Sequence, residues 1–440
     1  MPASPPVQPV PAPTVPAPTV PAQTDVLVVG AGPAGSGAAA WAARHGMETL
    51  LVDAAVFPRD KTCGDGLTPR AIHELQALGL TDWVRGHTVN HGLRAHGFGQ
   101  TLELNWPDVK GSDLPTWGSA VARTEFDDHL RRTAVASGAT CVDGARAVDV
   151  VMEGDRVSAV VLETTGPDGR QRVEVRCRWL VVADGVRSPL GKRLGREWHR
   201  DTVYGVAGRS YVKSERSDDP WISSHLELRD EGGKALAGYG WIFPLGTGEV
   251  NLGAGALATA KRPADIAVKP LMRHYADQLR DEFELHGDLR AEASALLPMG
   301  GAVSNVAGRN WALVGDAAGC VNPLNGEGID YGLETGRVLA ELLAVHGEDD
   351  GYSLAEAWPA LLRESYGESF SIARRLAGIA TVPKVITALG PIGMRSDLLM
   401  TLALRWMGNL VTEEDRDRAA RVWRWAGRQS IARDARPPFS

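Results

Sequence analysis

The stretch Asp25–Asp53 reads DVLVVGAGPAGSGAAAWAARHGMETLLVD. An apolar run, Val26–Val29, stops at Gly30, and a helix of small residues separates it from a second apolar run that ends at Asp53. This order of strand, glycine turn, helix, strand and acid is the fingerprint of a βαβ unit that binds a dinucleotide. The stretch therefore predicts an α/β fold with a dinucleotide site at its first turn.

Each position of this fingerprint has a physical role. Gly30 permits the tight turn, Gly32 lets the backbone approach a pyrophosphate, and Gly35 lets the helix pack close to the strand. Ala34 lies in the same turn, where the free N–H groups of the helix start attract an anion. Asp53 is placed to accept a hydrogen bond from a ribose hydroxyl.

Composition narrows the class of protein. The chain has 440 residues, of which 44% are hydrophobic, and this length favours two or three subdomains over one core. A net charge of -7 gives no support for binding nucleic acid. The four cysteines are widely spaced without a CxxC pair, which favours a reducing compartment. No uncharged apolar run approaches the ~18 residues that spanning a bilayer requires.

The first 24 residues differ from the rest of the chain. They contain nine prolines and no charge, and they carry the repeats VPAPT, VPAPT and VPAQT from Val10 to Thr24. Proline is excluded from helix interiors and central strands, so residues 1–24 are expected to form an extended, disordered arm. The arm lacks the basic start and apolar stretch of a signal peptide.

Two later segments repeat the combination of glycine and acid at a strand end. One is Ala183–Ser188 (ADGVRS), and the other is Val314–Ala318 (VGDAA), followed by Gly326–Ile329. Asp184 and Asp316 are each placed to reach a sugar-like hydroxyl, and a helix starting near Gly328 would direct its positive end at a ring that becomes anionic on reduction. Reduced flavin carries such a charge, so the three segments together favour FAD over NAD.

The chain order implies a discontinuous cofactor domain, because the first strand and the strand Trp311–Asp316 lie nearly 300 residues apart. The segment between them is β-rich, with glycine punctuation, and residues 354–428 read as helical. Pro167–Gly169 (PDG) is a hairpin turn signal. We predict an FAD-binding domain from 25–80, 118–200 and 298–345, a β-rich substrate domain from 81–117 and 201–297, and a C-terminal helical region over 346–440.

These motifs resemble those of a known family. GxGxxG, KxCGDG, ADGxRS and VGDAAG are similar to the glutathione-reductase-type flavoproteins of the p-hydroxybenzoate hydroxylase fold. Tyr239–Pro244 (YGWIFP), followed by Gly253–Gly255 (GAG), resembles the YxWxFP…GxG signature of the geranylgeranyl reductase family. Within that family, FPRDKTCGDGLTPRAI is most similar to flavin-dependent menaquinone reductases. The resemblance covers Asp25 to Val345.

The resemblance implies a fold and an activity. The fold would be the FAD-binding α/β fold with an inserted antiparallel sheet for the substrate and C-terminal helices. The activity would be the FAD-dependent saturation of one isoprene double bond of a polyprenyl lipid, the menaquinone tail. Related enzymes act on geranylgeranyl lipids or chlorophyll, a monooxygenase of the same fold would oxygenate an aromatic compound or polyketide, and a flavin redox sensor would have no turnover. No second GxGxxG unit is present, and the sequence names no electron donor.

The resemblance also implies cofactor contacts. Asp53, where many relatives have Glu, would hold the adenosine ribose, and Asp316 would bind the ribityl chain. The other implied contacts are grouped by the part of FAD that they would touch: the pyrophosphate by Gly30, Gly32 and Gly35, the phosphates by Arg123, the adenine side by Ala147, the neighbourhood of the flavin by Cys63, Gly64 and Gly66, and the isoalloxazine ring by Gly328 and Ile329.

Three aromatic residues of the signature share one face of a strand, because side chains alternate with period two: Tyr239, Trp241 and Phe243. They would line an apolar slot for a prenyl chain and stabilise positive charge that develops on the alkene; the alternative is an ordinary sheet core. Tyr239, Trp241 and Cys63 are therefore the catalytic candidates, with Tyr239, Cys63 or water as the proton source. We expect Lys61 to lower the pKa of Cys63 and Asp65 to raise it.

Two further patterns are weaker. His87, His91 and His96 allow a zinc site, but they lie in a turn-rich region without a cysteine pair, so we favour surface histidines and predict no metal. The segment Lys384–Val411 combines clustered leucines and methionines with Lys384, Arg395 and Arg405, which suits a membrane interface or a helix packed on the substrate domain. Because a polyprenyl substrate resides in a bilayer, we expect a cytoplasmic protein in peripheral contact with the inner face of the cell membrane.

Overall fold

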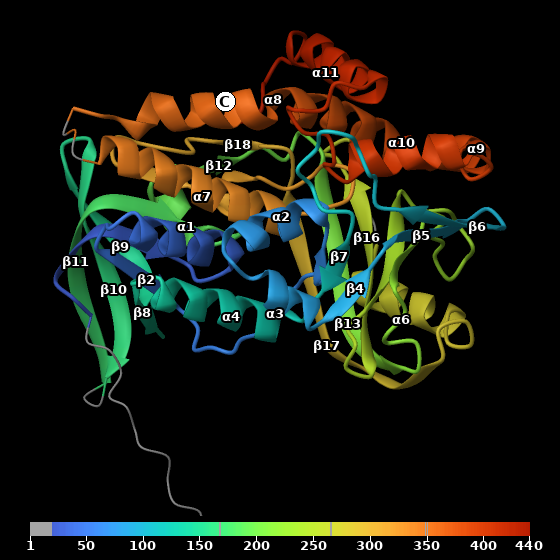
Figure 1. Ribbon diagram of the computed structural model, residues 1–440, viewed down its shortest axis with the longest axis horizontal. Helices are drawn as coiled ribbons and strands as arrows, with labels where there is room; N and C mark the ends of the chain where they lie inside the picture. The colour runs from blue at the N-terminus through green and yellow to red at the C-terminus, as the bar shows by residue number, and fades with distance from the viewer. Residues whose placement is uncertain (1–19, 167–168, 265, 348, 350) are drawn as a thin grey trace, which may run out of the picture.

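The computed structural model describes residues 20–166, 169–264, 266–347, 349 and 351–440 (Figure 1). Two sheets lie at opposite ends of the molecule, and the C-terminal helices run along one side of both (Figure 1). The hairpin turn predicted at Pro167–Gly169 falls largely outside the described residues, although Gly166 and Gly169 are paired across it.

The first sheet contains the βαβ unit. Its strands follow the order β8 (Thr140–Asp143), β2 (Thr49–Asp53), β1 (Gln23–Val29), β11 (Gly169–Val182), β10 (Arg156–Gly166) and β9 (Arg146–Glu153), and β19 (Trp311–Leu313) also pairs with β11. The pairs that β1 forms with β2 and β11 are parallel, as are β2–β8 and β11–β19, whereas β10 is antiparallel to both neighbours. Val26–Val29 is buried on both faces, which explains its unbroken apolar sequence.

Helices pack around this sheet. The long ones are α1 (Pro33–Arg44), α4 (Arg123–Ala136) and α7 (Ile329–His346). The shorter ones are α2 (Pro69–Ala77), α3 (Thr81–Arg85), α5 (Pro189–Arg193) and the 3-10 turn Gly315–Ala318. Two small sheets complete this part of the molecule: one contains β3 (Gly66–Leu67), β7 (Gly118–Ala120) and β4 (Thr88–Asn90), and the other contains β12 (Glu197–Trp198) and β18 (Val303–Ser304). α1 and α7 cross through small residues, since a Cβ on Gly336 would lie 2.4 Å from the carbonyl oxygen of Ala34.

The second sheet is formed by strands from the segments that were predicted as the substrate domain. Its order is β17 (Leu285–Pro298), β13 (Tyr204–Ser214), β16 (Glu249–Ala258), β15 (Gly238–Pro244), β14 (Trp221–His225), β5 (Gly92–Gly97) and β6 (Gln100–Asn105). All neighbours are antiparallel except β14 and β5. Helix α6 (Val268–Gln278) covers one face, where Met272 and Tyr275 share a buried cluster with Ile242. The opposite face meets the first domain, where the Asn251 side chain donates to the carbonyl of Cys63 at 2.8 Å.

Four helices form the C-terminal region: α8 (Leu354–Ala380), α9 (Pro383–Gly393), α10 (Asp397–Met407) and α11 (Arg418–Ile431). α8 is fixed to the first domain by the buried indole of Trp358, which donates to the carbonyl of Leu313 at 2.8 Å. No single described helix is long and apolar enough to cross a bilayer, whereas α8 and α9 together satisfy length and composition but bend by 104° at their junction.

The predicted fold class is confirmed, because a parallel dinucleotide-binding sheet, an antiparallel sheet and C-terminal helices are all present. One expectation is wrong: Gln23 and Thr24 belong to β1 rather than to a disordered arm. Both pair with β11, and the backbone carbonyl of Ala22 accepts from the Arg176 N–H at 3.0 Å. The polar residues before Val26 gave no indication that the strand begins earlier, because backbone pairing requires no particular side chain.

Gly336→Ala is expected to destabilise the protein by about 1–3 kcal/mol, because the new methyl group would force α7 away from α1. The matched control is Gly378→Ala in α8, where a Cβ meets nothing within 4 Å. That substitution should be neutral or stabilise by about 0.5–1 kcal/mol through helix propensity. Urea unfolding of both variants measures the contrast, and equal effects would contradict the close crossing.

Candidate cofactor and substrate site

Three backbone corners meet at the carboxyl edge of the first sheet. β1, β11 and β19 are adjacent and parallel, so Gly30, Asp184 and Gly315 follow their strands at the same edge. Gly30 has φ +104°, and a Cβ there would lie 2.3 Å from the carbonyl oxygen of Ala183. A Cβ on Gly315 would lie 2.8 Å from that of Ala34. The three motifs that the sequence places far apart are therefore in contact.

The start of α1 is flanked by two arginines. Gly32 is its N-cap residue, and a Cβ there would lie 3.5 Å from Arg59 and 3.9 Å from Arg123. Both guanidinium groups bind the buried Asp127, at 2.8 Å from Arg59 and at 2.6 and 2.7 Å from Arg123. The positive end of the helix and two oriented arginines form a site suited to phosphate groups.

A second group of charges lies between the other two corners. The Lys61 amine is 3.6 Å from the Cβ position of Gly185, and it attracts Asp316, whose carboxylate lies 2.9 Å from the Cβ position of Gly328. Burial lowers the pKa of Lys61 and raises that of Asp316, although Lys61, Arg123 and Arg196 oppose the latter shift. The structure thus brings Asp316 and Gly328 together.

The other predicted cofactor residues, Asp53, Ala147 and Asp184, lie next to the backbone turns that surround the site. Asp53 accepts from the Ala31 N–H at 2.7 Å and the Ala55 N–H at 2.8 Å, which fixes the turn. Ala147 lies on β9, near where the Ala145 N–H donates to the carbonyl of Asp53 at 2.8 Å. Asp184 accepts from the Leu190 N–H at 2.8 Å, so one of its oxygens is used to start α5.

This donor set fits FAD. Glycines line the turn where a Cβ would collide, cations surround the start of α1, and an acid stands at the opposite end beside the first turn of α7. Arg59, Arg123 and the α1 N-terminus would hold the pyrophosphate, Asp53 the adenosine ribose, and Asp316 with Gly328 the ribityl and ring end. Arg59 and Arg196 were absent from the sequence prediction, and Lys61 was expected only beside Cys63, because an isolated basic residue in a loop does not reveal its partner.

The aromatic residues of β15 form a row that faces the cofactor domain. The ring centroids of Tyr239 and Trp241 are 5.9 Å apart, and those of Trp241 and Phe243 are 6.4 Å apart. Cβ positions on Gly64 and Gly66 would lie 3.2 and 2.9 Å from the Phe243 ring. The period-two alternation therefore predicted the shared face correctly, and glycines in the Cys63–Gly66 loop allow this row to approach.

A buried polar network supports this loop. The fully buried Asp65 accepts from the Tyr211 hydroxyl at 2.7 Å and from the Asn251 amide at 2.9 Å. The Asn251 carbonyl oxygen accepts from the Trp241 indole at 2.9 Å. Asp65 has φ 65°, and burial raises its pKa to about 6 despite those two hydrogen bonds. This network fixes the Trp241 ring and the loop relative to each other.

The surroundings of Cys63 differ in part from the expectation. Burial is the largest influence and raises the pKa of the thiol, and Asp65 raises it further, as predicted. The cation that lowers it is Arg123 rather than Lys61, because Lys61 points towards Asp316. Cys63 is therefore a protonated thiol beside a guanidinium group.

One acid near the flavin motifs was missed by the sequence prediction. Glu327 accepts a short hydrogen bond from the Thr68 hydroxyl and a weaker one from the Asn325 amide at 3.3 Å. The Tyr239 hydroxyl donates to the carbonyl of Asn325 in the same loop. The sequence did contain a signal for it, because Glu327 stands between two glycines directly before α7. A charged residue at that position suggests a specific role.

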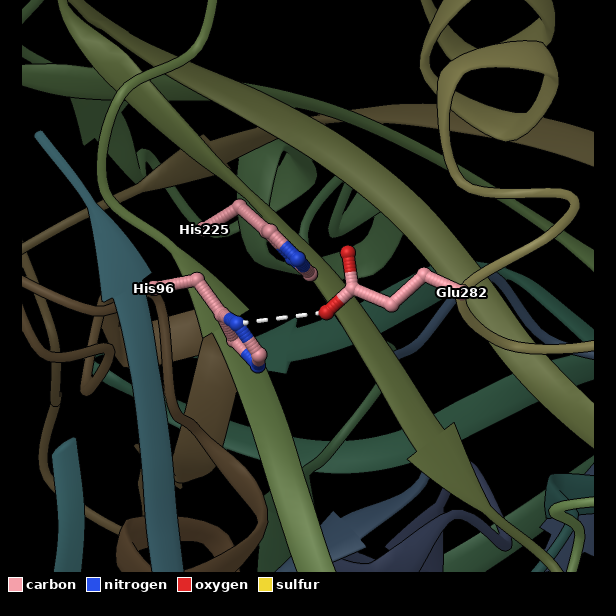
Figure 2. Close-up of side chains that lie close together, drawn as sticks. All are labelled: His96, His225 and Glu282. Carbon is pink, nitrogen blue, oxygen red and sulfur yellow. Dashed lines mark ion pairs between the residues drawn. The ribbon is translucent and has the colours of Figure 1, made fainter. Parts of the chain in front are cut away.

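The histidine interpretation requires a correction. His91 is exposed, but His96 is only 8% exposed and stacks on His225, with centroids 4.3 Å apart and planes 11° apart (Figure 2). Glu282 approaches His96 Nδ1 at 3.5 Å, and the Tyr275 hydroxyl lies 2.5 Å from His225 Nδ1. Burial lowers the pKa of His96 to about 4 and that of His225 to about 3. Since ring lone pairs lie in the ring planes, stacked imidazoles do not direct them at a common ion.

The glycine turn with its flanking arginines, and Asp316 beside Gly328, form the arrangement expected of a flavoprotein, and the aromatic row of β15 lies next to it. A family model described as an FAD binding domain matches residues 23–354. The chain is 60% identical to the menaquinone reductase of Mycolicibacterium smegmatis over 417 residues, which are 94% of this chain and 99% of that one.

More distant relatives agree with this match. The chain is 30% identical to digeranylgeranylglycerophospholipid reductase 1 of Methanopyrus kandleri, over 80% of this chain and 89% of that one. A solved geranylgeranyl bacteriochlorophyll reductase-like structure from Thermoplasma acidophilum superimposes with a TM-score of 0.72 at 21% identity, covering 91% of this chain and 98% of that one. The chain belongs to the FAD-binding family of menaquinone and geranylgeranyl reductases, and it is an FAD-dependent oxidoreductase.

Asp65→Asn is expected to gain stability relative to the wild type as the pH rises. The folded protein binds the Asp65 proton more tightly than the unfolded chain does, so this contribution is complete below pH ~4 and is lost as the pH approaches 6. Asparagine stays neutral, so the difference in unfolding free energy should shift in its favour by about 2 kcal/mol between pH 4 and 7. Urea unfolding of the ligand-free proteins measures this, and a pH-independent difference would contradict it.

Proposed function

We propose that this protein saturates one isoprene double bond in the tail of menaquinone. The observation that carries the proposal is the row of Tyr239, Trp241 and Phe243, which faces the loop expected beside the flavin. A quinone ring is planar and polar, and its reduction alone requires no long aromatic wall. The 60% identity to a menaquinone reductase over nearly the whole chain favours that lipid over the phospholipid of the more distant relative.

Bound FAD, reduced by an external donor, supplies hydride to the alkene. The residues of this chain bind and orient the tail. The face of Trp241, held by its hydrogen bond to Asn251, stabilises the positive charge that develops on the more substituted carbon, and such contacts are worth up to about 2 kcal/mol in a desolvated site. Cys63 lies close enough to Tyr239 to contribute to the raised pKa of its phenol.

The test is anaerobic incubation of dithionite-reduced holoenzyme with menaquinone, followed by mass analysis of the tail. A gain of two hydrogens in the tail is the expected result, and it should occur without oxygen. Menaquinone with the corresponding unit already saturated is the control and should not change. Reduction of the ring alone would contradict the proposal. Product formation that consumes oxygen stoichiometrically would indicate the monooxygenase alternative.

We also propose that α9 and α10 touch the membrane from which the substrate is taken. Helix α9 has no buried residue, and the most exposed leucines and isoleucine of the two helices are Leu389 (61%), Ile392 (59%) and Leu398 (70%). We call these three residues the α9–α10 surface. Lys384 and Arg395 are exposed beside it and suit anionic headgroups. Arg405 does not contribute as expected, because it is buried against Asp415 and Asp417 at 2.7 and 2.6 Å.

A buried apolar cluster reaches from α9 and α10 to the aromatic row. Met394 and Leu404, at the end of α9 and within α10, belong to a buried cluster against which Phe243 and Met400 pack. Figure 1 places α9 and α10 at the end of the molecule that holds the substrate sheet, away from the first sheet. A prenyl chain that leaves a bilayer at the α9–α10 surface would thus follow apolar side chains to Phe243.

The double variant Leu389→Ser/Leu398→Ser is expected to reduce cosedimentation with anionic liposomes about tenfold or more, since each leucine contributes about 1.5–3 kcal/mol when buried. The matched control is Val56→Ser/Val345→Ser, which alters two apolar residues of 70% and 77% exposure elsewhere. The control should bind as the wild type does. Equal loss in both variants, or no binding by the wild type, would contradict membrane contact at this surface.

A further inference from the structure

Glu327 lies where the cofactor and substrate segments converge. Its loop, Asn325–Gly328, precedes α7 and is only half-buried, whereas the residues on either side of it are buried. Thr68, from the end of the Cys63–Gly66 loop region, donates to one carboxyl oxygen of Glu327. Tyr239, from the aromatic row, donates to the backbone of Asn325. The carboxyl group therefore sits at the junction of three segments that border the expected ring of the flavin.

Its environment favours a neutral carboxylic acid. The loss of hydration on burial raises the pKa of Glu327 well above its usual value, and the nearby Asp330 raises it further. Hydrogen bonds from Thr68 and Asn325, and the more distant charge of Arg70, oppose this shift without cancelling it. The groups facing it from other elements are thus Arg70 on α2, Tyr239 on β15, and Asp330 and Tyr331 on α7.

We propose that Glu327 is the acid that gives the proton in the reduction of the alkene, an inference that rests on the proposed function. The π pair of the double bond takes the proton from the Glu327 carboxyl group, one C–H bond forms, and the O–H bond breaks to leave a carboxylate. Bound, reduced FAD would supply the hydride with which the second C–H bond forms at the other carbon. The external donor supplies the two electrons, and water restores the Glu327 proton before the next turnover.

The other acids of the site are less suited to this role. Asp65 is fully buried behind the Cys63 loop, with one oxygen already accepting from Tyr211 and Asn251. The thiol of Cys63 and the phenol of Tyr239 are weak acids whose pKa values burial raises further. The hydroxyl proton of Tyr239 is also already donated in a hydrogen bond to the Asn325 carbonyl. Glu327 is a carboxyl group, which is a stronger acid than a thiol or a phenol, and its surroundings favour the protonated form.

The first test requires no cofactor or substrate. Infrared spectra of the ligand-free protein at pH 8 should show a protonated carboxyl band that Glu327→Gln removes. Asp65→Asn should leave that band unchanged, because Asp65, with a pKa of about 6, is ionised there. Persistence of the whole band in Glu327→Gln would overturn the inference.

The second test uses the FAD-loaded enzyme. Glu327→Gln keeps an acceptor for Thr68 but has no acidic proton, so FAD affinity should change less than threefold while oxidation of the reduced enzyme by menaquinone slows about 10²–10⁴-fold. Glu327→Asp should recover part of that rate, and the exposed Glu356→Gln is the matched control, expected to behave as the wild type. A normal rate in Glu327→Gln with loss in Asp65→Asn would assign the proton to Asp65 instead. A wild type that leaves the tail unchanged would refute the proposed function itself.

Discussion

The close approach of backbone at one sheet edge is the constraint on which this structure depends. Gly35 would place a Cβ 1.7 Å from the carbonyl oxygen of Gly30, and Gly30 would place one 2.3 Å from that of Ala183. Neither distance leaves room for any side chain, so the α1 turn and the end of β11 meet only because these positions are glycine. The phosphate site, the position of α7 and the loop bearing Glu327 all follow from that contact.

Electrostatics then divide the site into two parts. Around the start of α1, Arg59 and Arg123 both bind Asp127. One anion thus orients two cations, and the net charge of the three side chains is positive. Around the aromatic row, burial raises the pKa of both Asp65 and Glu327, so both acids lose part of the preference for the charged form that an exposed carboxyl group has. The start of α1 is thus the more positive part of the site, and the surroundings of the aromatic row are less charged.

Much of this arrangement was predictable, because it is encoded by residues with strong backbone requirements. The glycines at 30, 32 and 35 predicted the first turn, and the alternation along β15 predicted the aromatic face. Charged residues were harder to place: Arg405 proved to be buried with two aspartates, and His96 stacks on a histidine more than a hundred positions away. Their partners lie on other elements, so no local pattern reveals them. Glu327 was missed for the same reason, since its acidity depends on Thr68 and Asp330.

The pairing of β19 with β11 has a consequence for how the chain is made. β11 pairs with β1 along one side, and on its other side β10 covers the first part while β19 covers the last three residues. A ribosome that has released the whole substrate sheet has still not supplied Trp311–Leu313. Until then the nascent chain carries an open strand edge and lacks Asp316 and Gly328, so a cofactor that needs these two residues can bind fully only late in synthesis.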